Sequence, residues 1–140
     1  MAVKQYDPAQ FQLIVNGNII SGFADGTFIS FTRSADSFSK TVGSDGEVTR
    51  TRMNDKSAEL TITLQQASAS NDILSDLYLL DELSGNGIVP VLMKDGSGNT
   101  IIGAAEAWIR KPADATFSNE AENREWVIDM AAADPFIGGN

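Results

Sequence analysis

Hydrophobic and polar positions alternate along most of this chain, which is the pattern of half-buried β-strands. The alternation is clearest in residues 58–65, where Leu60, Ile62 and Leu64 are separated by polar side chains. Similar patterns predict further strands at 11–15, 18–21, 27–33, 87–94, 100–111 and 124–132. Asn16-Gly17 predicts a type I′ turn between the first two strands, and DGSGN at 95–99 predicts a second hairpin turn.

One segment, residues 70–84, changes to a helical period. SNDILSDLYLLDEL begins with Ser70 or Asn71 as the expected N-cap, and Gly85 is suited to end the helix. The expected apolar stripe consists of Ile73, Leu74, Leu77, Leu80 and Leu83. The acids of the helix fall on the opposite, solvated side.

These elements predict a mainly β member of the α+β class. We expect an antiparallel sandwich or a curled, barrel-like sheet of seven or eight strands, flanked by one α-helix. The 140 residues are enough for one domain, 1–140, with its own core. The tail DPFIGGN is expected to be extended.

Residues 34–57, SADSFSKTVGSDGEVTRTRMNDKS, contain few large apolar side chains. Weak alternation on both sides of GSDG predicts a hairpin that reaches about 20 Å from its base. The two strands beside this turn carry Lys40, Arg50 and Arg52, three of the chain's 10 basic residues. A two-stranded ribbon is marginal in water, so we expect another chain to cover it; a long unstructured loop is the alternative.

The composition excludes several classes of functional site. The chain has no Cys and no His, which removes disulfides, thiolate zinc sites and His-dependent triads. Its net charge of −9 is unsuited to gripping a phosphate backbone. MAVKQYDPAQ lacks the apolar run of a signal peptide, and no apolar stretch approaches a membrane span. We therefore expect synthesis in a cytoplasm.

The sequence contains only weak signals for a catalytic or metal-binding site. Five acidic residues towards the C-terminus could form a glycosidase pair or a hard-cation site: Asp114, Glu120, Glu122, Glu125 and Asp129. Most of them lie in or near the polar stretch FSNEAENRE, which favours solvated carboxylates over a catalytic pair. The glycine-rich turns fit neither a P-loop nor an EF-hand. Trp108 and Trp126 fit core or interface packing. We assign no catalytic, cofactor-binding or metal residue.

An acidic body with a projecting arm that carries basic residues suggests head-to-tail self-assembly, which gives rings when it closes and filaments when it does not. A carbohydrate- or cation-binding β-sandwich that uses the acids above remains the alternative from another class.

Several stretches occur in an order that resembles the tail tube proteins of contractile-tailed bacteriophages. They are YDPAQFQLIVNG, SGFADGTFI, GSDGEVTRTR, TLQQASASNDIL and REWVI. The resemblance runs from Tyr6 to about Ile137. The same family is similar to the tube subunits of type VI secretion systems and R-type pyocins.

The resemblance implies a virion structural protein without enzymatic activity or cofactor. Six copies would form a ring whose inner strands join in one barrel, and stacked rings would form the tube for viral DNA ejection. Implied partners are further copies, the sheath, the tail terminator and the baseplate hub, with DNA passing unbound. An effector-delivery tube of a type VI-like or pyocin-like system is the alternative within this class.

The residue pattern, together with the resemblance, predicts two sets of site residues. The inter-ring set on the arm is Phe38, Lys40, Val42, Asp45, Glu47, Val48, Arg50 and Arg52. The candidate lumen-facing set, on the strand whose other face is apolar, is Glu59, Thr61, Thr63 and Gln65.

Overall fold

The structure, a computed structural model, describes residues 3–139. Its elements are η1 (Pro8–Gln10), β1 (Phe11–Val15), β2 (Asn18–Ile20), β3 (Ile29–Arg33), β4 (Phe38–Val42), β5 (Val48–Arg52), β6 (Ala58–Leu64), α1 (Ser70–Ser84), β7 (Val89–Asp95), β8 (Ile101–Lys111), β9 (Arg124–Met130) and β10 (Ala133–Phe136). No helix in this part of the chain is both long and apolar enough to cross a membrane.

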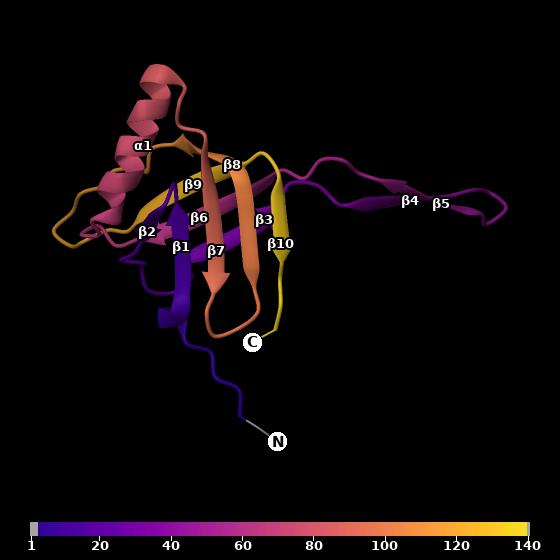
Figure 1. Ribbon diagram of the computed structural model, residues 1–140, viewed down its shortest axis with the longest axis horizontal. Helices are drawn as coiled ribbons and strands as arrows, with labels where there is room; N and C mark the ends of the chain where they lie inside the picture. The colour runs from indigo at the N-terminus through magenta and orange to yellow at the C-terminus, as the bar shows by residue number, and fades with distance from the viewer. Residues whose placement is uncertain (1–2, 140) are drawn as a thin grey trace.

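Eight strands form one antiparallel sheet in the order β2-β1-β7-β8-β9-β6-β3, with β10 paired to β8. The sheet curls so that β1, β7 and β8 lie across β3, β6 and β9 (Figure 1). Its end strands β2 and β3 do not pair with each other, so the curled sheet does not close into a barrel. The expected mainly β, antiparallel class with one helix and a projecting hairpin is confirmed.

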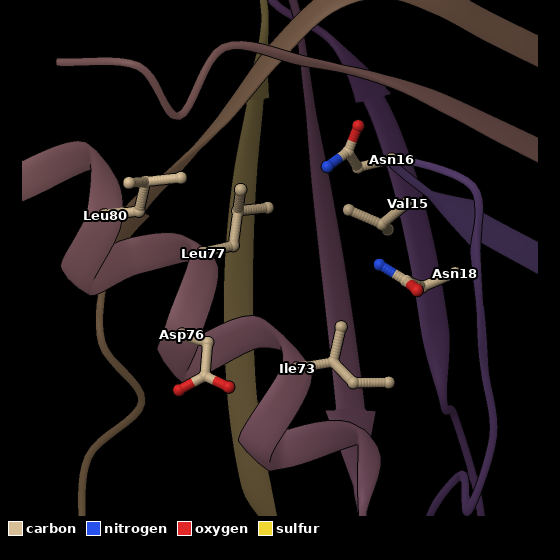
Figure 2. Close-up of a pocket in the computed structure, with 7 residues that line it drawn as sticks. All are labelled: Val15, Asn16, Asn18, Ile73, Asp76, Leu77 and Leu80. Carbon is tan, nitrogen blue, oxygen red and sulfur yellow. The ribbon is translucent and has the colours of Figure 1, made fainter.

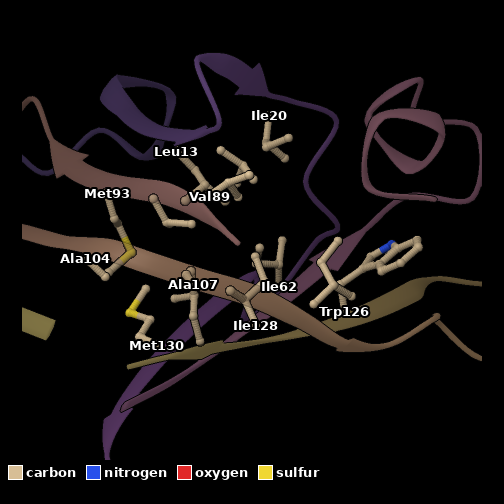
Figure 3. Packing of buried hydrophobic residues seen from close by; sticks show 14 of the residues in the cluster. Leu13, Ile20, Ile62, Val89, Met93, Ala104, Ala107, Trp126, Ile128 and Met130 are labelled. Carbon is tan, nitrogen blue, oxygen red and sulfur yellow. The ribbon is translucent and has the colours of Figure 1, made fainter. Parts of the chain in front are cut away.

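The core lies between the two layers of the curled sheet. Burial alternates strictly along β6, where Leu60, Ile62 and Leu64 are fully buried. Figure 3 shows Leu13 and Met93 from one layer facing Ile128 and other side chains of the opposite layer. Each fully buried aliphatic side chain contributes about 2 kcal/mol by leaving water, so the alternating pattern both forms the strands and holds the layers together.

The start of α1 differs from the expected capping. Ala69, with helical backbone angles, occupies the N-cap position and makes no side-chain cap. Ser70 instead accepts a hydrogen bond at Oγ from the Ser21 backbone N–H at 2.9 Å. Asn71 donates its side-chain amide to the carbonyl oxygens of Gln65 and Ser68. The side chains expected to cap the helix therefore tie it to the preceding loop and to the chain after β2. The expected end at Gly85 is confirmed by its left-handed backbone, φ 72°.

The expected apolar stripe is only half buried. Leu74 is fully buried and Leu77 nearly so, but Leu80 is 50% exposed and Leu83 is 88% exposed. The N-terminal half of α1 lies over the end of the curled sheet, whereas its last turns extend past the strands (Figure 1). The helical period was right, but the sheet is too short to cover its whole length.

The tail forms one more strand than the sequence predicted. β9 ends at Met130, and β10 resumes pairing along β8, with Pro135 opposite Ile102. Pro135 has no N–H to donate, and its position in an edge strand accommodates that loss.

Candidate assembly surfaces

Residues 34–57 (hereafter the arm) form a hairpin that projects from the body on the side away from α1 (Figure 1). Cross-strand partners point to the same face, and the register pairs Phe38 with Arg52, Lys40 with Arg50 and Val42 with Val48. These six residues form one face, which we call the apolar–cationic face. The other face carries Ser39, Thr41, Thr49 and Thr51. All ten strand residues are exposed, so neither face is buried within this chain.

The arm is held locally by its turn. The Gly43 N–H donates to the Glu47 carbonyl oxygen at 2.8 Å, and the Glu47 N–H donates to Asp45 Oδ1 at 3.1 Å. Gly46 has φ 89°, a conformation that glycine adopts without steric cost. The GSDG sequence therefore encodes a closed turn that sets the register of both strands. Asp45 and Glu47 lie at its tip.

The base of the arm is fastened to the body. The Ser34 N–H donates to the Ser57 carbonyl oxygen at 3.0 Å, where the two strands leave the sheet. Asp55 Oδ1 accepts hydrogen bonds from the hydroxyl and the backbone N–H of Ser57, and these bonds lower the pKa of Asp55. The base is thus ordered, while the strands beyond it lack support from the body.

Within the arm, one cation is already engaged. The Arg50 guanidinium lies over the Phe38 ring, 3.7 Å from the ring centroid, a cation–π contact. No hydrogen bond or ion pair engages the Lys40 ammonium within residues 3–139. The apolar–cationic face therefore presents Lys40 together with Val42 and Val48, both more than half exposed.

The predicted lumen residues lie mostly together. Glu59, Thr61 and Thr63 are half-buried on the outer face of β6, opposite the core residues of that strand. Gln65 is exposed and follows the end of the strand, where its N–H donates to the Gly22 carbonyl oxygen. The β3 partners on this outer face, Ser30 and Thr32, are also polar.

The sequence reasoning missed a charged network on this outer face. Arg110 Nη2 lies 2.6 Å from Glu59 Oε2 and 2.6 Å from Asp129 Oδ1, joining β6, β8 and β9. Asp129 and, secondarily, Glu59 raise the pKa of Arg110 above its already high usual value. The sequence offered one signal for this network, namely a basic residue, Arg110, at an outward-facing position of a predicted strand. We call the surface of Ser30, Thr32, Glu59, Thr61, Thr63, Arg110 and Asp129 the polar sheet face.

The acids considered for catalysis or cation binding do not form one cluster. Asp114 and Glu125 line a cavity of about 240 Å³ together with Lys111. Asp129 pairs with Arg110 instead. Glu120 and Glu122 lie in the loop between β8 and β9. Within residues 3–139, no three His, Cys, Asp or Glu side chains are arranged to hold a metal ion. The two tryptophans pack, Trp126 in the core and Trp108 half-buried on the sheet.

Comparison with known proteins gives a consistent result. The model of the Bacteriophage PhiTE tail tube protein family matches residues 14–138. Structural protein ORF10 of Pseudomonas phage KPP10 is 33% identical over 143 residues, covering 96% of this chain and 83% of that protein.

Solved structures share the fold at low sequence identity. The sheath/tube terminator of an extracellular contractile injection system, PVC, in its extended state aligns with TM-score 0.65 and 12% identity, over 97% of this chain and all of that one. The tube-terminating cap of the anti-feeding prophage gives TM-score 0.59 and 11% identity, over 97% and 94% of the two chains. A chain of the PVC sheath–tube complex in its extended state aligns with TM-score 0.64 and 10% identity, over 94% of this chain and 91% of that one.

Proposed function

Because the chain belongs to the Bacteriophage PhiTE tail tube protein family, we propose that it self-assembles into stacked hexameric rings that form the channel for DNA ejection. The arm is the observation that carries this proposal. Every residue of its two strands is exposed in the described chain, and such ribbons are marginally stable alone. A neighbouring copy supplies the missing cover, so the subunit is complete only in the assembly.

The arm makes the contact between rings. Its apolar–cationic face carries Lys40, Arg50 and Arg52, whereas the whole chain has a net charge of −9. Opposite charges steer such contacts and fix their register. The tip acids Asp45 and Glu47 take part by meeting polar donors on the adjacent ring.

The polar sheet face lines the channel. Its hydroxyls and its one paired cation leave nothing that would grip a phosphate backbone strongly, because DNA affinity depends on unpaired Lys and Arg. Glu59, Thr61 and Thr63 are central to it, and Gln65 continues the wall beyond the strand end. The free edge of β3 is available for pairing with the next subunit of a ring.

The remaining roles follow from this assembly. The protein acts as a structural component of the virion tail, made in the bacterial host, and performs no catalysis. Its partners are the surrounding sheath, the terminator and the baseplate hub, in addition to its own copies. The 33% identical phage protein favours a virion over an effector-delivery tube, and the dispersed acids argue against a carbohydrate- or cation-binding site.

Electron microscopy of the purified protein tests the proposal. Light scattering over a concentration series should rise above a threshold without any added ligand, and negative stain should show tubes with a central channel. A chain that stays monomeric at all soluble concentrations would contradict self-assembly. A different ring symmetry in the images would correct the hexamer while retaining the tube.

A further inference from the structure

A groove lies between α1 and the β1–β2 hairpin, and no side chain among residues 3–139 fills it. It encloses about 360 Å³ and is lined by Val15, Asn16, Asn18, Ile73, Asp76, Leu77 and Leu80. Figure 2 shows the leucines and Ile73 on the helix facing Val15 and Asn18 across this space. We call it the helix groove.

The helix groove is both apolar and negative. Ile73 is half-buried and Leu80 is 50% exposed, so its helical wall offers aliphatic surface to a partner. Within residues 3–139, no hydrogen bond or ion pair engages the Asp76 carboxylate. The helix itself carries four carboxylates and no basic residue. A fitting partner therefore presents small apolar side chains next to a cation.

The tip half of the arm has this composition. Val42 is 57% exposed and Val48 is 60% exposed, and the two form one cross-strand pair. The next residue along the same face of β4 is Lys40, whose ammonium is unengaged in the described chain. The two asparagines on the other wall of the groove carry amide donors for the acids at the arm tip.

We propose that the helix groove is the receptor for the arm of a second copy, with Val42 and Val48 against Ile73 and Leu80 and Lys40 beside Asp76. The arm leaves the body on the side away from α1 (Figure 1), so a chain's own arm does not reach its own groove. This inference rests on the proposed tube function and identifies the partner surface for its inter-ring contact.

A second apolar cavity of similar size is less suited to the arm. It is lined by Phe11, Phe28, Ile29 and Met93, with Asp95 as its acid. Asp95 Oδ1 already accepts hydrogen bonds from the backbone N–H and the hydroxyl of Ser97. A cation from the arm would have to displace these bonds, whereas Asp76 is available.

Disulfide trapping tests the contact directly, because the chain contains no cysteine. In assembled particles of Val42→Cys with Leu80→Cys, mild oxidation should give a ladder of covalent oligomers on a non-reducing gel. Thr41→Cys with Leu80→Cys is the matched control, since Thr41 lies on the opposite face of the arm. We expect at least about tenfold less cross-linking there. Equal ladders, or none from Val42→Cys with Leu80→Cys in well-formed tubes, would overturn the assignment.

A charge exchange provides an independent readout that needs no thiol. Lys40→Glu alone and Asp76→Lys alone should each lower the polymerised fraction about tenfold at a fixed concentration. Combining both in one chain should restore most of it. Glu120→Lys, on an exposed loop, makes the same charge change as Asp76→Lys and should leave polymerisation within about twofold. Thermal melting of each variant checks that the body is folded.

The outcomes separate the two proposals. If the unaltered chain forms tubes but the exchange fails to restore assembly, the helix groove is not the receptor and the tube function stands. An equal loss of polymerised fraction in Glu120→Lys would assign the effect to net charge, and would also contradict the helix groove as the receptor. If the unaltered chain never polymerises, both proposals fail together.

Discussion

At the scale of single residues, Asn71 connects three parts of the molecule. Its side-chain amide donates to the Gln65 carbonyl oxygen at 2.9 Å and to that of Ser68 at 3.1 Å. Its Oδ1 accepts from Trp126 Nε1 at 3.0 Å. One side chain thus joins the start of α1, the preceding loop and β9, which explains why an asparagine lies in the first turn of the helix.

Asn71→Ala should lower the free energy of unfolding by about 2 kcal/mol, because several hydrogen bonds are lost and the Trp126 N–H, on a largely buried ring, loses its partner. Asn86→Ala is the control, since Asn86 is exposed just after α1, and it should change stability by less than about 0.5 kcal/mol. Urea denaturation followed by tryptophan fluorescence measures both. Similar values for the two variants would contradict the connecting role of Asn71.

Under the proposed function, the charges of the arm act in assembly and not in folding. Arg50→Glu with Arg52→Glu should give folded monomers or rings but few long tubes in negative stain, because a neighbour's carboxylates would then face like charges. Lys4→Glu with Lys111→Glu makes the same change of net charge on exposed body residues and should still give tubes. Normal tube lengths from the arm variant would count against the inter-ring role.

At the scale of elements, only part of the apolar stripe of α1 is buried by packing against the sheet. Leu74 and Leu83 are the same residue type on the same expected stripe, yet one is fully buried and the other is 88% exposed. The arm shows the converse, because its strands form although all ten of their residues are exposed in the single chain. Turn chemistry and the hydrogen bonds at its base define the hairpin, and its faces are left for a partner.

Leu74→Ala should destabilise the protein by about 3 kcal/mol, the loss expected for a leucine removed from a packed core. Leu83→Ala should change the free energy of unfolding by no more than about 0.5 kcal/mol. Thermal and urea unfolding by circular dichroism compares the pair. Were the two losses equal, the placement of α1 over the sheet would be wrong.

At the scale of the whole molecule, the polar sheet face and the core are the two sides of the same strands. Arg110 is paired with two carboxylates there, so the face carries no unpaired cation at its centre. Under the proposed function, this balance lets DNA pass because there is little to hold its phosphates. Under the same proposal, assembly and DNA passage depend on different surfaces.

Thr61→Lys with Thr63→Lys should leave tube assembly normal but slow DNA ejection by about tenfold or more at low salt, with recovery as salt rises. Thr61→Asn with Thr63→Asn, which adds no charge, should eject at the ordinary rate. Dye-based measurement of DNA release from purified phage gives both rates. Unchanged ejection in the lysine variant, with normal tails, would place this face outside the channel.

Much of the fold could be predicted because the signals are local. The period of two in β6 and the Asn16-Gly17 turn, with φ 51° and 79°, follow from pleat geometry and turn sterics. The exposed Leu80, the pairing of β10 and the Arg110 network could not be predicted. The Arg110–Glu59 contact joins residues 51 positions apart, and no local pattern specifies which distant strand becomes a neighbour.

By itself, the sequence determined where most of the strands lie, that 70–84 is helical and ends at Gly85, which face of each strand is apolar, and that the arm has few large apolar side chains to bury. These properties depend on backbone geometry and on the transfer of side chains out of water. Only the tertiary structure decided how far the sheet covers α1, which acids meet Arg110 and where the helix groove opens. Those features depend on the relative placement of elements, which is set by the packing of the whole core.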